Sequence, residues 1–472
     1  MPYRHKLMRS LVLVAVAIAL IATTIYLVRA FDSRDMRALD LEHRLTLSTE
    51  FQASRNESID WSEYLSMEAA VATELEQALR ERSRNASLLN RHATSSQANP
   101  DNHAINWNRS YKRDPGSVRG SAVLLHGLTD SPYSVRTLAE AFTTQGFVTF
   151  VPRLPGHGFA VGDLRARTHQ DWSAVVELTV QAAGQFSKEG PLVIGGYSNG
   201  GILALNYALD CQQDPSLPCP DAILLLSPAI AVSPFAFLAR LHNLLSWLPY
   251  FEKFQWAPVN PEVDPFKFTS FPKNAGWQTA DLARQVRKKL MASSHPLPRI
   301  LAFQSVVDAT VSTDAVLQFF IGLQPGDHQL VFYDMNRSEM LSDWLKQQLV
   351  SLQEFETRSP LSFDVTILSN SDDTDKRISE YSLAAGESQF RVSQTGLQWP
   401  KGVYSLSHIA LPFPPDDPMY GKDGQAIGAL SPRGEHGMLY VDASYFQRLR
   451  FNPFYDYQQG KIVQWLQELT QP

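Results

Sequence analysis

The chain has 472 residues, of which 44% are hydrophobic and 19% are charged, a globular composition that excludes a mainly disordered or fibrous protein. Its 42 basic and 48 acidic residues give a net charge of −6 without a dense basic stretch, which argues against a nucleic-acid-binding protein. Two cysteines are too few for a disulfide scaffold or a four-cysteine zinc site.

An apolar segment lies near the amino end. Arg4, Lys6 and Arg9 precede an uncharged run over residues 11–28, and as a helix this run would extend roughly 27 Å, close to the thickness of a bilayer's hydrocarbon core. The basic cluster favours a cytoplasmic amino end and export of the rest. We therefore expect residues 1–30 to form an uncleaved single-span membrane anchor. A cleaved signal peptide and a buried helix are the alternatives.

Residues 31–110 are polar and mixed in charge. Residues 31–99 are rich in Glu, Arg, Ala and Leu and contain neither a glycine nor a β-rich run. Residues 95–102 are typical of a linker. This region is expected to be a helical or partly ordered stalk.

Residues 111–472 show the pattern of an α/β domain. Apolar, strand-like runs alternate with helical stretches such as VRTLAEAFTTQ and WSAVVELTVQAAGQF. Continuous apolar strands separated by amphipathic helices predict a mostly parallel, doubly wound sheet with both faces covered. The strand-like runs are SAVLL, FVTFV, PLVIG, DAILLL and RILAFQ.

An insertion at about 228–298 interrupts this alternation. It is rich in proline and aromatic residues, and we expect a helical cap whose apolar underside lines a substrate pocket. Ordinary core packing of the same aromatic residues is the alternative, and the two are compatible. The aromatic residues are Phe235, Phe237, Trp247, Tyr250, Phe251, Phe254, Trp256 and Trp277.

A candidate nucleophile follows the run PLVIG. Residues 196–200, GYSNG, fit the pattern G-x-S-x-G and are followed by the helical stretch ILALNYAL. A strand, a sharp turn and a helix form the context in which such a serine is nucleophilic. The amino end of that helix would favour negative charge at the site. Ser198 is therefore the candidate nucleophile, and the alternative is a glycine-rich turn without a chemical role.

A serine nucleophile needs a base, and the base needs an orienting acid, in the chain order serine, acid, histidine. Asp308 follows the strand-like run RILAFQ and is the candidate acid, whereas Asp314 lies at an expected helix start that suits a cap. The candidate base is His408, which follows the strand-like run GVYSL at the start of a loop. His328 precedes a strand, and His436 lies in a polar turn.

An oxyanion hole would complete such a site. The run SAVLL leads into HGLTDSP, so the backbone N–H groups of Leu128 and Asn199 are the candidate donors. We expect His126 to brace this loop. Residues 155–158, PGHG, are expected to form a structural turn.

No motif for a metal or cofactor is evident. Asp416 and Asp417 are flanked by prolines and favour a turn over a metal site. A phosphate-binding loop, an H-E-x-x-H motif and a dinucleotide fingerprint are missing from the sequence, so we predict no cofactor and no metal. Cys211 and Cys219 are the two ends of the segment CQQDPSLPC. They would form a disulfide bond in an oxidising compartment and would remain free thiols in the cytosol.

Together, HGLTDSP, LPGHG, GYSNGG, SVVDATV and SLSHIALPFPPDDPMYG resemble the α/β-hydrolase superfamily. Within it they are most similar to bacterial carboxylesterases and monoacylglycerol-lipase-like, serine-aminopeptidase-type hydrolases. The resemblance covers residue 120 to the carboxyl end, and it requires an insertion with the strand-like runs LVFY and FDVTIL between acid and base. Many relatives carry Met, Leu or Thr in place of Asn199, but only its backbone N–H is needed. The resemblance implies Ser198 as nucleophile, Asp308 as acid, His408 as base, and Leu128 and Asn199 as oxyanion donors.

These patterns predict a membrane-tethered serine hydrolase that cleaves carboxylic esters, as a carboxylesterase or lipase does, through an acyl-enzyme. The aromatic insertion and the tether favour a small or lipid-derived ester as substrate. The domain would lie on the exported side, which is the periplasmic face of the inner membrane in a Gram-negative bacterium. A peptidase or thioesterase would use the same residues, and a hydrolase-fold binding protein without turnover is a further alternative.

Overall fold

The computed structural model describes residues 2–56, 58–83, 89–186, 188–231, 252–308, 310–337, 355, 357–358, 360–370, 375–424, 430–431 and 448–471. Residues 232–251 of the expected cap, with five of its aromatic residues, lie outside the described residues. His436 lies outside them as well.

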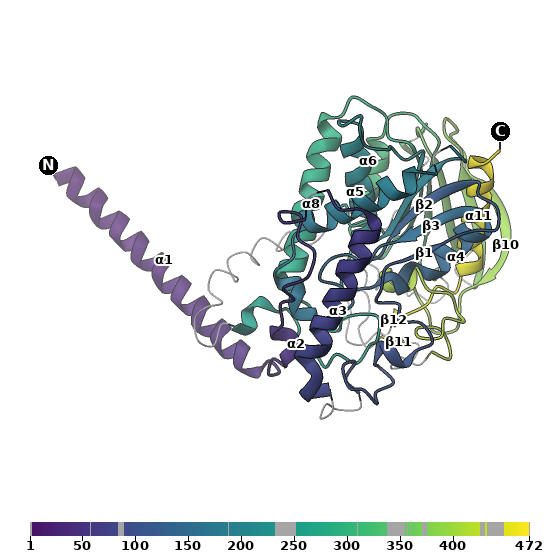
Figure 1. Cartoon of the computed structure of the whole chain (residues 1–472). Helices are drawn as coiled ribbons and strands as arrows, with labels where there is room; N and C mark the ends of the chain where they lie inside the picture. The colour runs from purple at the N-terminus through teal and green to yellow at the C-terminus, as the bar shows by residue number, and fades with distance from the viewer. Residues whose placement is uncertain are drawn as a thin grey trace.

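A mixed sheet lies between helices in the α/β domain (Figure 1). It has ten strands, in the order β1-β3-β2-β4-β5-β6-β7-β8-β9-β10. The strands from β3 to β8 in that order run parallel, as predicted, and β1, β9 and β10 are antiparallel additions at the edges. A separate ribbon pairs β11 with β12. The strands are β1 Tyr111–Arg113, β2 Gly120–Leu125, β3 Phe147–Val151, β4 Leu192–Tyr197, β5 Ala222–Leu226, β6 Arg299–Ser305, β7 His328–Tyr333, β8 Asp364–Asn370, β9 Arg377–Leu383, β10 Arg391–Gln398, β11 Leu430–Ser431 and β12 Arg448–Leu449.

Helices cover both faces of the sheet. One face carries α5, α6, α8 and α9, and the other carries α4 and α11. Part of the expected cap, α8, therefore belongs to the helical layer beside α6. The helices are α1 Pro2–Asp35, α2 Leu41–Arg44, α3 Trp61–Ser83, α4 Arg136–Thr144, α5 His169–Gly184, α6 Asn199–Cys211, α8 Lys273–Ala292, α9 Thr313–Ile321 and α11 Tyr455–Leu469, with short 3-10 turns η1 Pro100–Asn102, η2 Pro132–Val135, η3 Val161–Arg165, η5 Glu252–Gln255 and η8 His408–Ala410.

The long helix α1 projects from the rest of the protein (Figure 1). Its segment Met8–Val28 is long and apolar enough to cross a membrane, and none of it is buried. An apolar helix near the amino end is a feature of signal sequences as well as of membrane anchors, so this segment is compatible with both of the leading sequence interpretations.

The region expected to be a stalk differs from the prediction. Residues 36–56, 58–83 and 89–110 pack against the α/β domain, and α3 lies along it (Figure 1). Leu47, Tyr64 and Val71 are at most 1% exposed. Their side chains contact buried residues of the domain such as Phe159 and Val175. Both apolar contacts and buried ion pairs hold this layer, and Glu50 and Glu68, which count as polar in the composition, pair with the buried Arg153 of the domain.

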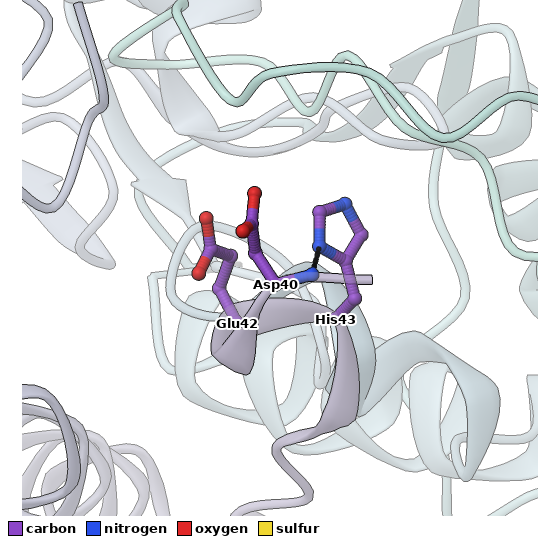
Figure 2. A group of neighbouring side chains, drawn as sticks. All are labelled: Asp40, Glu42 and His43. Carbon is purple, nitrogen blue, oxygen red and sulfur yellow. Dashed lines mark hydrogen bonds between the residues drawn. The ribbon is translucent and has the colours of Figure 1, made fainter. Parts of the chain in front are cut away.

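Three side chains with metal-ligating groups, Asp40, Glu42 and His43, lie together at the start of α2 (Figure 2). Both ring nitrogens of His43 already have partners: Nδ1 accepts a hydrogen bond from the Asp40 N–H at 3.1 Å, and Nε2 lies 2.9 Å from Ser270 Oγ. The Asp40 carboxylate pairs with Arg37 at 2.9 Å. These contacts are those of a helix cap that fastens α2 to the domain.

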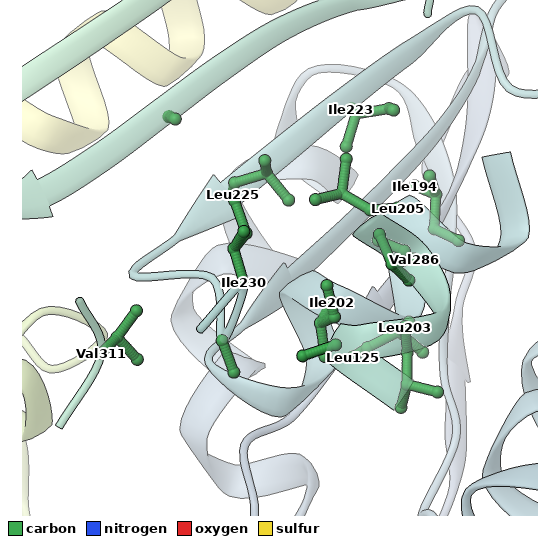
Figure 3. Close-up of a cluster of buried hydrophobic side chains, with 14 of the residues drawn as sticks. Leu125, Ile194, Ile202, Leu203, Leu205, Ile223, Leu225, Ile230, Val286 and Val311 are labelled. Atoms are coloured by element: carbon green, nitrogen blue, oxygen red, sulfur yellow. The ribbon is translucent and has the colours of Figure 1, made fainter. Parts of the chain in front are cut away.

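Side chains of the central strands alternate between the two helical layers. In β2, Val123 and Leu125 face the α5–α6 layer, whereas Ala122 and Leu124 face the α4–α11 layer. Figure 3 shows the first of these clusters, where apolar residues of the strands interdigitate with those of α6. Burial of each large apolar side chain contributes roughly 1.5–3 kcal/mol, so the centre of the sheet is a rigid base for the loops at its ends.

Candidate active site

Ser198 occupies the sharp turn between β4 and α6. Its φ is 55°, a left-handed conformation that is strained for serine, and its N–H donates to the Leu226 carbonyl at 2.9 Å. The two glycines of the motif are required by close approach of the backbone. A Cβ on Gly196 would lie 2.2 Å from the Gly200 backbone, and one on Gly200 would lie 2.2 Å from the Leu125 carbonyl oxygen. The turn therefore holds the serine at the end of the central strand.

Asp308 and His408 are in direct contact. Asp308 follows β6, and its Oδ2 lies 2.8 Å from Nδ1 of His408, with both side chains buried. The other oxygen accepts hydrogen bonds from the N–H groups of Thr310 and Val311 at 2.8 and 2.9 Å. Burial alone would raise the pKa of Asp308, but the His408 ring and these N–H groups outweigh it and lower that pKa. A carboxylate at this position orients Nδ1–H toward itself and leaves Nε2 as an acceptor.

The His408 ring lies beside the turn that carries Ser198. The ring of Tyr197, the preceding residue, has its centroid 5.2 Å from that of His408, and the Tyr197 hydroxyl donates to the His408 carbonyl at 3.4 Å. Among the described residues, no hydrogen bond joins Ser198 Oγ to His408. Catalytic hydrogen bonds are often long without substrate and shorten when it binds.

The approach of the chain to His408 differs from the prediction. The sequence predicts a strand over GVYSL, but residues 402–406 form no strand, and the Tyr404 carbonyl instead accepts a hydrogen bond from the Asn336 N–H at 2.6 Å. Leu406 is nevertheless fully buried, and Ser407 Oγ donates to the Leu449 carbonyl at 2.8 Å. His408 then begins η8. Its position is therefore fixed by core packing and by β12 rather than by the sheet.

The acidic pair after His408 forms a turn, as predicted. Asp417 is buried, and its Oδ1 accepts hydrogen bonds from the Met419 and Tyr420 N–H groups at 2.8 Å and from the Tyr133 hydroxyl at 2.9 Å. Its Oδ2 pairs with Arg136 at 2.8 Å. The carboxylate thus ties the loop that follows His408 to η2 and α4.

The loop after β2 carries the first candidate oxyanion donor, Leu128. His126 braces this loop, because its Nδ1 lies 2.9 Å from the Gly127 carbonyl and its Nε2 accepts a hydrogen bond from the Leu154 N–H at 3.0 Å. Burial holds the pKa of His126 well below its ordinary value, so the ring is neutral. Thr129 follows with a φ of 65°, which turns the loop sharply.

The second candidate donor, Asn199, begins α6. Because β2 pairs with β4, with Leu125 opposite Gly196, the two strands end side by side, so the segments that carry Leu128 and Asn199 begin at the same end of the sheet. No described residue accepts a hydrogen bond from either N–H group. The Asn199 side chain is engaged elsewhere, since its Oδ1 accepts from Thr279 Oγ1 at 2.9 Å.

The alternative acid and base lie elsewhere. Asp314 is exposed in the first turn of α9, where Ser312 is the residue that caps the helix. His328 begins β7, at the amino end of the strand, whereas Asp308 follows the carboxyl end of β6. Gln304 was not among the residues predicted from the sequence, and its Nε2 donates to Asp308 Oδ2 at 3.1 Å. The available signal was a glutamine directly after the apolar run ILAF of β6, near the carboxyl end of the strand.

Cys211 and Cys219, which the sequence left as a disulfide or two thiols, are disulfide-bonded. The bond joins the end of α6 to the segment that precedes β5. This is the arrangement expected for an oxidising compartment.

Comparison with known proteins agrees with this fold. Residues 116–343 match the family model described as serine aminopeptidase, S33. The match includes Ser198, Asp308, Leu128 and Asn199, whereas His408 lies beyond it. The thermostable monoacylglycerol lipase of Bacillus sp. (strain H-257) is 29% identical over 173 residues, which are 36% of this chain and 63% of that protein. The chain thus spans less than two thirds of that relative's length.

Two solved structures are similar to this chain at low sequence identity. The monoacylglycerol lipase of Paleococcus ferrophilus is 20% identical with a TM-score of 0.36, over 48% of this chain and 89% of that one. A chain from work on the metagenome-derived lipolytic enzymes LipS and LipT is 22% identical with a TM-score of 0.39, over 49% and 89%. The mostly parallel sheet is compatible with an α/β-hydrolase fold, and residues 116–343 resemble the serine-aminopeptidase-type, monoacylglycerol-lipase-like hydrolases of that superfamily.

Proposed function

We propose that this protein is a serine hydrolase of carboxylic esters, with Ser198 as nucleophile, His408 as base and Asp308 as the acid that orients the base. The observation that carries the proposal is the strained Ser198 turn beside the His408–Asp308 pair, whose heavy atoms are 2.8 Å apart. A nucleophile on a strained turn and a base held by a buried carboxylate are the two parts that acyl transfer requires.

In this mechanism Ser198 Oγ attacks the ester carbonyl while Nε2 of His408 takes its proton. The imidazolium is stabilised by Asp308, and the Leu128 and Asn199 N–H groups donate to the oxyanion of the tetrahedral intermediate. His408 then protonates the leaving alcohol. Water, deprotonated by the same ring, releases the acid from the acyl-enzyme and restores Ser198.

The substrate that we propose is a small or lipid-derived ester. The curated relative is named a monoacylglycerol lipase, which favours an ester over an amide. The apolar segment Met8–Val28 supports a tether that keeps the domain near lipid, on the exported face of the membrane. The disulfide between Cys211 and Cys219 agrees with export to an oxidising compartment.

Hydrolysis of a matched substrate series tests this proposal. The full chain, in detergent or nanodiscs, is assayed with p-nitrophenyl esters of increasing chain length, with a monoacylglycerol, and with an aminoacyl-amide and a thioester beside them. Ester turnover that exceeds amide and thioester turnover, and that disappears in Ser198→Ala, is the expected result. Faster turnover of the aminoacyl-amide than of the esters would contradict the esterase assignment and identify the protein as a peptidase. Absence of turnover on every substrate would favour a binding protein.

A further inference from the structure

A buried ion-pair cluster joins the N-terminal layer to the loop after β3. Arg153, in that loop, is fully buried, and its NH1 and NH2 lie 2.7 and 2.9 Å from the two carboxylate oxygens of Glu50. Its Nε lies 3.2 Å from Glu68 Oε2 on α3. Glu50 and Glu68 are 1% and 3% exposed on their side chains. A bidentate ion pair of this kind fixes both the orientation of the Arg153 guanidinium and its distance from the Glu50 carboxylate.

The N-terminal layer also holds the backbone of the same loop. Glu50 Oε2 accepts a hydrogen bond from the Gly156 N–H at 3.1 Å, and the Tyr64 hydroxyl donates to the Arg153 carbonyl at 2.5 Å. Arg153 NH1 in turn donates to the His157 carbonyl at 3.1 Å. Charges are buried at a large desolvation cost and remain so only when they are paired. The path of residues 153–157 therefore depends on Glu50.

This loop reaches the oxyanion loop through His126. Leu154, the neighbour of Arg153, donates its N–H to His126 Nε2 at 3.0 Å, and the His126 and His157 rings lie 5.0 Å apart edge to face. On its other side, Nδ1 of His126 lies 2.9 Å from the Gly127 carbonyl. The next residue is Leu128, whose N–H is a proposed oxyanion donor.

We infer that Glu50 and Arg153 are positioning residues that set the Leu128 N–H for the oxyanion through Leu154 and His126. This inference rests on the proposed function. An oxyanion donor must lie about 2.7–3.1 Å from the developing charge, so a small displacement of the loop weakens transition-state binding. The Leu128 N–H binds the transition state more strongly than the bound substrate, because the negative charge develops only during the reaction. A displaced N–H should therefore lower kcat and leave KM nearly unchanged.

Glu50→Gln in the full chain tests the inference. The variant keeps the size of the side chain but removes the charge that pairs with Arg153. Active sites are first titrated with a fluorophosphonate, so that only folded protein with a reactive Ser198 is counted. We expect kcat for a p-nitrophenyl ester per titrated site to fall about tenfold or more, with KM within about twofold, and the affinity for a boronic-acid transition-state analogue to weaken by the same factor as kcat.

A matched control separates positioning from general loosening of the segment. Glu74 accepts hydrogen bonds from the Ser48 and Thr49 N–H groups at 2.8 and 2.9 Å, close to Glu50 in the chain. Glu74→Gln should leave kcat per titrated site unchanged, and Glu50→Asp, which keeps the charge, should restore part of the loss.

Two outcomes would contradict the positioning role or the proposed function, and they differ in what is measured. If Glu50→Gln lowers the number of titrated sites while kcat per site stays at the wild-type value, the pair is merely structural and the inference is wrong. Should that variant yield no titratable sites, Glu68→Gln, which removes the second carboxylate, is judged by the same two outcomes. A wild-type protein that neither turns over esters nor reacts with the probe would contradict the proposed function instead, so the two failures are distinct.

Discussion

His408 Nδ1 and Asp308 Oδ2 lie 2.8 Å apart, although the two residues are separated by 100 positions in the chain. The intervening segment supplies β7, β8, β9 and β10, which extend the sheet at one edge without separating the pair. After β10 the chain returns through the buried Leu406 to the carboxyl end of β6. A long insertion between acid and base is thus accommodated at the edge of the sheet.

Asp308→Asn should abolish most of the activity. An amide at this position can donate to Nδ1 and so hold the ring in the wrong tautomer, which lowers kcat by about 10⁴-fold in sites of this type. Asp314→Asn should change kcat less than twofold, because Asp314 is exposed in the first turn of α9. Steady-state kinetics with a soluble ester compares the two variants. A larger decrease of kcat in Asp314→Asn than in Asp308→Asn would identify Asp314 as the acid.

The centre of the fold could be predicted from the sequence because parallel strands have a local signature. The runs around Ala122, Val193 and Ile223 are continuously apolar, and each corresponds to a fully buried strand. The turn at Ser198 was equally visible, because the glycine pattern, the strand before it and the helix after it all lie within a short stretch of sequence.

The N-terminal layer could not be predicted in the same way. Glu50 and Arg153 are 103 positions apart, and a charged residue has the same local pattern whether it is solvated or buried in an ion pair. The aromatic residues of the insertion were ambiguous for a similar reason. Trp256 is 1% exposed and packs edge to face on His43 at 5.1 Å, so it belongs to a structural contact with the N-terminal layer.

The stability of the protein should fall on acidification because of His157. Burial lowers the pKa of this ring to about 4 from an ordinary value of 6.5. Below pH 6.5 the unfolded chain therefore binds a proton that the folded chain does not. Between pH 7 and pH 5 this difference removes about 2 kcal/mol of unfolding free energy, and the loss continues until the pH reaches the folded pKa.

Urea denaturation at pH 5 and pH 7 measures that dependence. His157→Asn should lose about 2 kcal/mol less than the wild type between the two pH values, whatever its absolute stability. His295 is exposed, so His295→Asn should retain the wild-type difference. An unchanged difference in His157→Asn would mean that this ring is protonated in the folded protein.

Two truncations should distinguish an N-terminal layer from a stalk. Residues 36–472 lack α1 but keep Glu50 and Glu68, so this variant should fold and hydrolyse a soluble ester at the full-length rate. Residues 111–472 leave the buried Arg153 without either carboxylate, and removal of a partner from a buried pair costs about 3–5 kcal/mol. Soluble yield and urea midpoints report the difference, and equal stability of the two variants would restore the stalk interpretation.

The most direct test of the proposed chemistry is reaction with a fluorescent fluorophosphonate, followed by mass spectrometry of the modified peptide. The wild-type protein should be labelled at Ser198 and lose its esterase activity in the same proportion. Ser198→Ala should be neither labelled nor active, with kcat lower by several orders of magnitude. Labelling at a different residue, or turnover retained in Ser198→Ala, would contradict the account.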